Sequence, residues 1–192
     1  MFLPWFAPED LGSWEDRGLS AATAAGPQSY SFHDFHRRIV AVEPPGLPLA
    51  KGPFRTIAEA IHRYDIFPQS LGRGVLRRPV QIGDVVGLRY YLMPGLHIFF
   101  ASRVYEVFEE ELRSGFSYET LQGHPEAGQE TFAVSKDPQS GAIVASLRAW
   151  SHLAPPWPRL LSPLTRPLQC GAGRAALDHF ERLVLEKHSA AK

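Results

Sequence analysis

The sequence contains a single cysteine, Cys170, among 192 residues. One thiol excludes an intrachain disulfide and a multi-cysteine metal site, which is typical of a reducing, cytoplasmic setting. No apolar run reaches the roughly 18 residues that a bilayer-spanning helix needs. The richest stretch, Tyr90 to Ala101, is interrupted by Pro94, Gly95 and His97. No basic residue precedes the apolar N-terminus, so we expect no secretory signal.

The sequence also has no excess of positive or negative charge, because 20 basic and 20 acidic side chains give a net charge of zero. Proteins that bind nucleic acid or a membrane surface gain affinity from clustered positive charge. We therefore expect neither nucleic acid nor membrane insertion. The sequence lacks a phosphate loop, a dinucleotide fingerprint and a nucleophile elbow, and we expect no cofactor.

What remains is the composition of a soluble globular protein, with 44% hydrophobic and 21% charged residues. Residues 1–29 differ from the rest, since residues 20–27 are small and rich in helix breakers. We predict an N-terminal arm over residues 1–29 and one domain over residues 30–192. Trp5 and Trp14 of the arm are expected to dock on the body of the protein. The alternative is that they anchor a partner or a second copy in a homodimer.

The domain is expected to begin with a strand near residues 35–42, followed by a helix that starts at Pro53 and ends before Pro68. Five segments rich in β-branched and aromatic residues follow, joined by short turns. Strands joined in this way pair antiparallel. The five segments are Val85 to Met93, Ile98 to Phe108, Gly115 to Leu121, Glu130 to Ser135 and Ala142 to Leu153.

A long helix is predicted after Pro158, running to about Lys187 with an apolar stripe. Gly171 and Gly173 interrupt it, which indicates either a bend or the close approach of a large side chain from the sheet. The predicted fold class is α+β, with a curved antiparallel sheet gripping the C-terminal helix. Such an arrangement suits a pocket between sheet and helix.

The run from Gly115 to Glu130 reads Gly-Phe-Ser-Tyr-Glu-Thr-Leu-Gln-Gly-His-Pro-Glu-Ala-Gly-Gln-Glu. It resembles the signature of the family called domain of unknown function nineteen-ninety. Further matches lie at Arg103-Val104, Tyr64 to Pro68 and Ala149-Trp150-Ser151. The resemblance implies a helix-grip fold similar to START-like and pollen-allergen-like lipid-binding proteins. It brings no established activity.

Within this signature, His124 near Glu126 has the composition of an acid/base pair. The alternative interpretation is a structured turn, in which Gly123 and Pro125 set the backbone and His124 hydrogen-bonds a carbonyl group. Glu130 is predicted to be either a solvated edge charge or the buried partner of an arginine. We expect Arg103 or Arg166 to pair with Glu130 or Glu126, because an isolated buried charge is costly.

Other reactive side chains give weaker signals. His33 and His36 share a face only in a helix, and no third ligand is evident, so we expect no metal site. Cys170 lacks an activating pattern, and we interpret it as a small buried hydrophobic residue.

The leading hypothesis is a non-enzymatic protein that holds a hydrophobic or amphipathic small molecule between sheet and C-terminal helix. Its predicted lining comprises Arg103, Tyr118, Thr120, Trp150 and Arg166. A second hypothesis is a cyclase- or hydrolase-like enzyme for a hydrophobic substrate, with His124 or Glu130 as proton shuttle. A third is an interaction module that uses the N-terminal aromatic arm.

Overall fold

The computed structural model describes residues 9–20, 32–93, 95–154 and 162–188, with the backbone alone for residues 32–34, 153 and 162–169. Its elements follow the predicted order, with one additional short helix and one additional short strand. They are α1 (Gly12–Glu15), β1 (Phe32–Val42), α2 (Pro53–His62), β2 (Gly72–Val75), β3 (Val85–Met93), β4 (Leu96–Glu109), β5 (Arg113–Thr120), β6 (Glu126–Lys136), β7 (Ala142–Leu153) and α3 (Ser162–His188).

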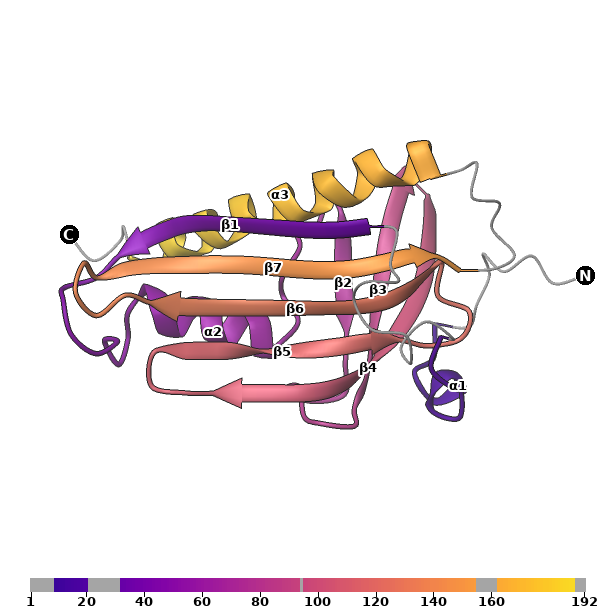
Figure 1. The fold of residues 1–192 in the computed structure, drawn as a ribbon, viewed down its shortest axis with the longest axis horizontal. Coiled ribbons are helices and arrows are strands. Elements are labelled where there is room, and N and C mark those ends of the chain that lie inside the picture. Colours follow the sequence, from indigo (N-terminus) through magenta and orange to yellow (C-terminus); the bar gives the residue numbers. More distant parts are fainter. Residues whose placement is uncertain (1–8, 21–31, 94, 155–161, 189–192) are drawn as a thin grey trace, which may run out of the picture.

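The strands form one antiparallel sheet in the order β1-β7-β6-β5-β4-β3-β2 (Figure 1). Strands β2 to β7 neighbour one another in chain order, as short turns dictate, and β1 joins the sheet beside β7. The described helices are too short or too polar to cross a membrane. The predicted α+β class, with a curved antiparallel sheet and a long C-terminal helix, is confirmed.

Helices α2 and α3 cover one side of the sheet, which we call the inner face. Phe54, Ile57 and Ile61 of α2 are fully buried there, at the spacing that the sequence predicts. Helix α3 contributes Ala176, Leu177, Phe180 and Val184 to the same core. Burial of this continuous apolar surface supplies the main driving force for folding.

The start of α2 is fixed by a buried ion pair at one end of the sheet. Lys136 of β6 donates to Glu43 Oε2 at 3.0 Å and to the carbonyl oxygens of Pro44 and Leu47. Glu43 in turn accepts the backbone N–H of Phe54, in the first turn of α2, at 2.9 Å. This carboxylate therefore caps the helix from outside, at the end where the helix dipole favours negative charge.

The opposite, outer face of the sheet receives the described part of the arm. Trp14 of α1 is fully buried there, edge-on to Phe99 and packed with Leu121. The chain continues to Ser20, whose backbone N–H donates to the carbonyl oxygen of Thr120. Docking on the body is thus confirmed for Trp14, whereas Trp5 lies outside the described residues. The arm boundary at residue 29 and the homodimer through the arm stay predictions.

Besides the additional helix α1 and shifts of one to three residues at the ends of β1, β4 and β5, strands β2 and β6 differ from the sequence-based expectation. Strand β2 is absent from the prediction because Gly72 and Gly74 have little strand propensity; it forms by pairing with β3. Strand β6 begins at Glu126 and not at Glu130, because residues 126–129 continue the pairing with β7. The predicted bounds of β3 and β7 agree with the structure.

Candidate functional site

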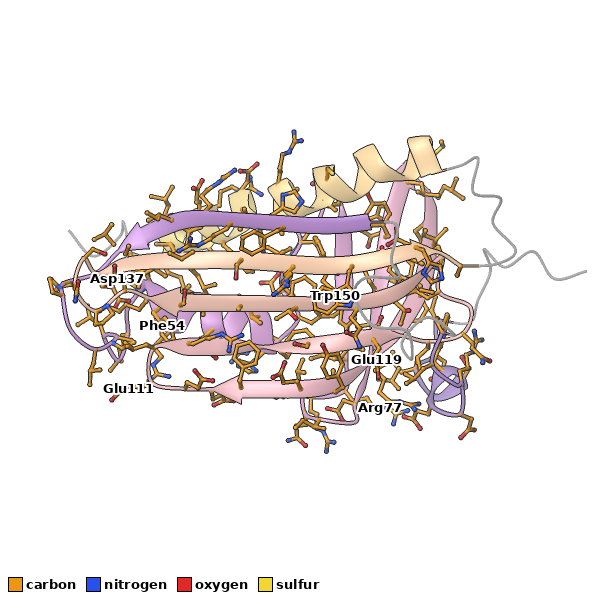
Figure 2. The ribbon with its side chains drawn as sticks, viewed as in Figure 1. Phe54, Arg77, Glu111, Glu119, Asp137 and Trp150 are labelled. Atoms are coloured by element: carbon orange, nitrogen blue, oxygen red, sulfur yellow. The ribbon has the colours of Figure 1, made fainter. Side chains whose placement is uncertain are left out.

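The inner face is apolar under α2 and polar at the opposite end of the sheet. Side chains two apart in a strand share a face, so the apolar positions Phe116 and Phe132 are followed by Tyr118 and Glu130. In Figure 2, Phe54 marks the α2 end of the molecule and Trp150 lies toward the other end. We call the inner-face residues beyond the apolar core the polar end; they are His36, Ser102, Tyr118, Thr120, Glu126, Glu130 and Ser151, with His124 from the β5–β6 loop.

Tyr118 and Glu130 form the centre of the polar end. They are opposite each other in the β5–β6 register, and the Tyr118 hydroxyl donates to Glu130 Oε2 at 2.7 Å. The Tyr64 ring lies edge-on to that of Tyr118, with the two centroids 6.4 Å apart. Burial, and secondly the Glu130 charge, raise the pKa of both phenols. Both therefore stay protonated and present hydroxyl groups beside a carboxylate.

Tyr64 reaches this position through an unusual backbone conformation. Its φ of 54° lies in the left-handed region, and it is the one non-glycine residue there in the described chain. Such a conformation is unfavourable for an aromatic residue and persists only where its surroundings impose it. Tyr64 is 3% exposed and packs edge-on against Phe116, Tyr118 and Phe132.

His124 is held in a turn that orients its ring. Gly123 has φ of 99°, and the His124 N–H donates to the carbonyl oxygen of Leu121 at 3.0 Å. The Glu126 N–H donates to His124 Nδ1 at 3.0 Å. The structured-turn interpretation is therefore correct: His124 bonds a carbonyl group through its backbone N–H, while its ring accepts from the amide of Glu126.

The protonation of His124 follows from these contacts. Burial lowers the pKa of its imidazole to about 3, so the ring is neutral at physiological pH. Because Nδ1 accepts a hydrogen bond, the single ring proton lies on Nε2. That Nε2–H is buried, beside the Phe100 ring, and has no hydrogen-bond partner among the described residues.

His36 lies on the inner face of β1, opposite Leu147 in the register. A Cβ at Gly173 of α3 would overlap its ring, so glycine allows the helix to approach here. The predicted close approach of a large sheet side chain is confirmed at this glycine. His36 Nε2 is a second buried ring nitrogen without a partner in the described part of the chain.

Helix α3 extends over the polar end. Its Asp178 and Glu181 bond Arg38 of β1, and its Gly173 contacts His36. Earlier residues of α3 therefore lie beside earlier residues of β1. Figure 1 shows α3 running along β1, with the N-terminal end of the helix near the start of the strand. The backbone of residues 162–169 is helical, which places Arg166 in this part of α3.

Thr120 and Ser151 have their hydroxyl groups engaged within the sheet. Thr120 Oγ1 accepts the Gly128 N–H at 2.9 Å and lies 3.3 Å from the Gly128 carbonyl oxygen. Ser151 Oγ donates to Glu126 Oε2 at 2.9 Å. These contacts fix the strands at the polar end, where Ala149, also directed inward, remains partly exposed.

The residues predicted to line a ligand site are divided between the two faces. Tyr118 and Thr120 face inward, whereas Arg103 and Trp150 are offset by odd spacings from the inward Val104 and Leu147 and lie on the outer face. Arg103 donates to the backbone carbonyl oxygen of Glu15 at 2.5 Å. The expected pairing with Glu130 or Glu126 is thus not made by Arg103, and for Arg166, whose side chain lies outside the described residues, it stays a prediction.

Trp150 belongs to a small outer cluster with Ala127 and Ala154. Its indole N–H donates to Gln129 Oε1 at 3.1 Å.

Sequence reasoning missed His36 as a member of the polar end, and it missed Tyr64 as a neighbour of Tyr118. Their signals were present: Gly173 indicates a bulky neighbour, and Tyr64 lies within a segment of the family resemblance. Of the two histidines weighed as metal ligands, His36 lies on the inner face of β1, and the side chain of His33 lies outside the described residues. The described residues hold no cluster of histidine, cysteine and carboxylate side chains suited to a metal ion.

Solved structures of similar shape support the helix-grip fold. The di-domain ARO/CYC StfQ of the steffimycin biosynthetic pathway matches with a TM-score of 0.56 at 12% identity, over 85% of this chain and 53% of that one. The hypothetical protein jhp0584 of Helicobacter pylori matches with a TM-score of 0.56 at 10% identity, over 86% and 95%. Identities this low establish the fold and nothing more.

The family follows from the sequence itself. Residues 15–179 match the family described as Domain of unknown function (DUF1990), and the chain belongs to that family. It is also 33% identical over 91 residues to the UPF0548 protein of Deinococcus radiodurans. That match covers 47% of this chain and 43% of the relative, so the chain spans less than half of the relative's length.

Proposed function

We propose that the protein binds an amphipathic small molecule on the inner face, at the polar end beneath the first turns of α3. The observation that carries this proposal is the pair of buried ring nitrogens, His36 Nε2 and His124 Nε2, that lack partners among the described residues. Buried polar groups are normally hydrogen-bonded, and leaving one unsatisfied costs about 1–3 kcal/mol. A ligand that supplies the missing partner recovers that energy.

The chemistry of the polar end indicates what the ligand carries. His124 offers a buried N–H donor, which suits a carbonyl, ether or hydroxyl oxygen. Phe100 beside it, and the apolar core under α2, favour a hydrophobic body. The expectation of a hydrophobic or amphipathic ligand is therefore narrowed to a molecule with at least one acceptor oxygen.

An enzyme remains the second candidate because of Glu130. A carboxylate next to two neutral phenols on a partly buried face has the composition of a general acid/base site. The similarly folded ARO/CYC protein belongs to a biosynthetic pathway. His124 is the poorer proton shuttle of the two, since a pKa of about 3 keeps it neutral at the pH of the cell.

The test introduces a large side chain on the inner face, where it would block a ligand. Ala149 faces inward beside Glu130 in the register, and Ser146 of the same strand faces outward. We expect Ala149→Phe to abolish binding of a neutral naphthylamine fluorophore, and Ser146→Phe to leave it unchanged. Native mass spectrometry of the freshly purified chain then identifies any co-purified molecule. Equal binding by the two variants would refute an inner-face site.

The role of His124 is tested by His124→Asn. An asparagine oxygen accepts the N–H two residues on, so the turn is kept, while the shorter side chain places no donor where the imidazole Nε2–H lies. For a co-purified ligand with an acceptor oxygen, we expect affinity to fall about threefold to tenfold, which is the net worth of one hydrogen bond. Unchanged affinity would show that His124 does not contact the ligand.

A further inference from the structure

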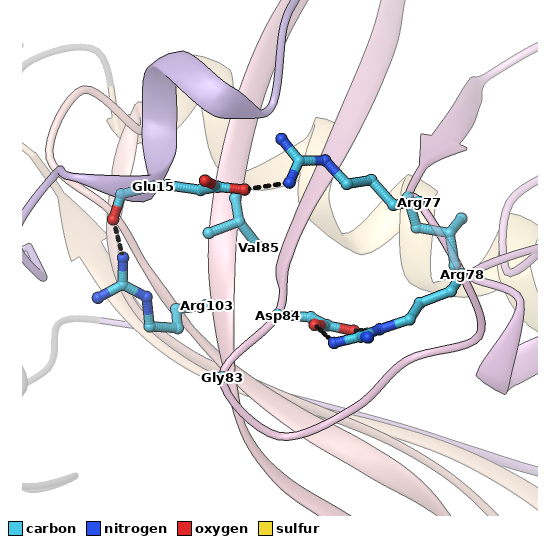
Figure 3. Close-up of a pocket in the computed structure, with 8 residues that line it drawn as sticks. Glu15, Arg77, Arg78, Gly83, Asp84, Val85 and Arg103 are labelled. Carbon is cyan, nitrogen blue, oxygen red and sulfur yellow. Dashed lines mark hydrogen bonds and ion pairs between the residues drawn. The ribbon is translucent and has the colours of Figure 1, made fainter.

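A second candidate site lies on the outer face, separated from the polar end by the sheet. It is a cleft of about 570 Å³ between α1, the segment after β2 and the middle of β4 (Figure 3). That volume is within the range typical of small-molecule sites. The lining residues are Glu15, Leu76, Arg77, Arg78, Gly83, Asp84, Val85 and Arg103.

The positive and negative charges of the side chains that line this cleft do not cancel. Three arginines and two carboxylates line it, and three minus two leaves one positive charge. Arg78 and Asp84 form a two-bonded pair at 2.7 and 3.3 Å, and Asp84 also accepts the Gln81 N–H. These hydrogen bonds stabilise the loop before β3.

Arg77 and Arg103 are held by a single residue of α1. The Glu15 carboxylate pairs with Arg77 at 2.6 Å, and the Glu15 backbone carbonyl accepts from Arg103 at 2.5 Å (Figure 3). The second described contact of Arg103 is also a backbone carbonyl oxygen, that of Arg17. A carbonyl oxygen carries only a partial charge, so the half-buried Arg103 is the arginine of the lining that pairs with no lining carboxylate. Glu119, opposite Arg103 in the β4–β5 register, accepts from Gln129 Nε2 at 3.1 Å.

An anionic ligand can displace the Glu15 carboxylate from Arg77. Its side chain is 48% exposed and that of Arg77 is 63% exposed. Exposed ion pairs of this kind contribute little to stability, so an incoming anion displaces Glu15 at small cost. Guanidinium groups match carboxylate and phosphate oxygens with two parallel hydrogen bonds, a geometry that backbone carbonyls cannot offer Arg103.

We propose that this cleft binds a small anionic molecule through a carboxylate or phosphate group held between Arg77 and Arg103. The anion takes the place of the Glu15 carboxylate, and the apolar side chains of Leu76 and Val85 contact the remainder of the molecule. Binding here does not depend on the inner-face ligand, because the two sites lie on opposite faces of the sheet.

The test is calorimetry on the full chain with inorganic phosphate and with citrate, at ionic strength held constant with sodium chloride. Saturable binding of phosphate alone indicates a phosphate ester, and of citrate alone a carboxylate; both results support the site. Binding of neither probe, by the wild type and by Glu15→Gln alike, overturns it.

Variants locate the binding within the protein. We expect Arg77→Gln and Arg103→Gln each to weaken binding at least about tenfold, since each removes a charged hydrogen-bond pair. Glu15→Gln is expected to tighten binding several-fold because it removes the competing carboxylate. Arg148→Gln, at an exposed arginine stacked on Trp150 elsewhere on the outer face, is the matched control.

Arg103 also holds α1, so its variant requires an independent check. Circular dichroism reports whether it is folded, and Arg77→Gln, at an exposed side chain, provides the same test without that concern. Amide NMR shifts of residues 12–15 are expected to move on phosphate or citrate binding. Affinities of Arg77→Gln and Arg103→Gln equal to that of Arg148→Gln would overturn the proposal.

Discussion

Replacing Lys136 by methionine is expected to be among the most damaging single changes in this protein. The side chain of Lys136 is fully buried, and that of Glu43 is only 1% exposed. Lys136 Nζ donates to three oxygens at 2.9–3.0 Å, which uses all of its protons. Methionine fills a similar volume and contributes none of these bonds, so it leaves a carboxylate buried without its counter-charge.

The magnitude follows from the surroundings of Glu43. Burial alone would raise the pKa of this carboxyl, but the N–H groups of Phe54 and Leu49 and the Lys136 ammonium outweigh it and hold the pKa below its ordinary value. Glu43 is therefore ionised at neutral pH. Breaking a buried pair by removing one partner costs about 3–5 kcal/mol, a large part of the ~5–15 kcal/mol stability of a typical domain.

Urea denaturation at neutral pH, followed by tryptophan fluorescence and circular dichroism, measures the loss. Lys187→Gln removes an exposed contact to Glu59 at 3.8 Å and is the control, expected to change stability by less than about 1 kcal/mol. In a double-mutant cycle with Glu43→Gln, the coupling energy is expected to be ~2 kcal/mol or more. A Lys136→Met variant as stable as the control would refute the reasoning.

Two further predictions concern the polar end. Gly171→Ala, with open space around the glycine, is expected to stabilise α3 by up to ~1 kcal/mol, whereas Gly173→Ala is expected to destabilise the protein by about 1–3 kcal/mol because its Cβ meets the His36 ring; thermal unfolding that ranks the two alike would contradict this contact. For His124, the folded pKa of about 3 lies below the ordinary 6.5, so the unfolded state binds a proton that the native state refuses. This contribution to stability is complete above pH 6.5 and is lost as pH falls toward 3, by up to ~1.4 kcal/mol per pH unit; His124→Asn should lack it, and parallel stability curves for the two proteins would count against a buried neutral histidine.

Much of the fold could be predicted from local sequence. β-branched and aromatic residues predict the strands Val85 to Met93 and Ala142 to Leu153, and Pro53 predicts the start of its helix. These signals depend on near neighbours in the chain, so a reader of the sequence can use them. Strand β2 was missed because its glycines form a strand only through pairing with β3.

The candidate site was only partly predictable. Tyr118, Thr120, Glu130 and His124 were found because they lie in one continuous signature. Arg103 and Trp150 were grouped with them, although strand alternation places both on the other face. The parity of a strand position is readable from the sequence, but which parity faces α3 depends on packing between distant segments.

By itself, the sequence determined the α+β class, the antiparallel order and the family, because period, turn chemistry and motif are local properties of the chain. Only the tertiary structure decided that Tyr64 meets Tyr118, that His36 lies against Gly173, and that Glu15 occupies a cleft between Arg77 and Arg103. Each of these contacts joins residues far apart in the chain. Their meeting is fixed by the burial of the common core, which no local pattern records.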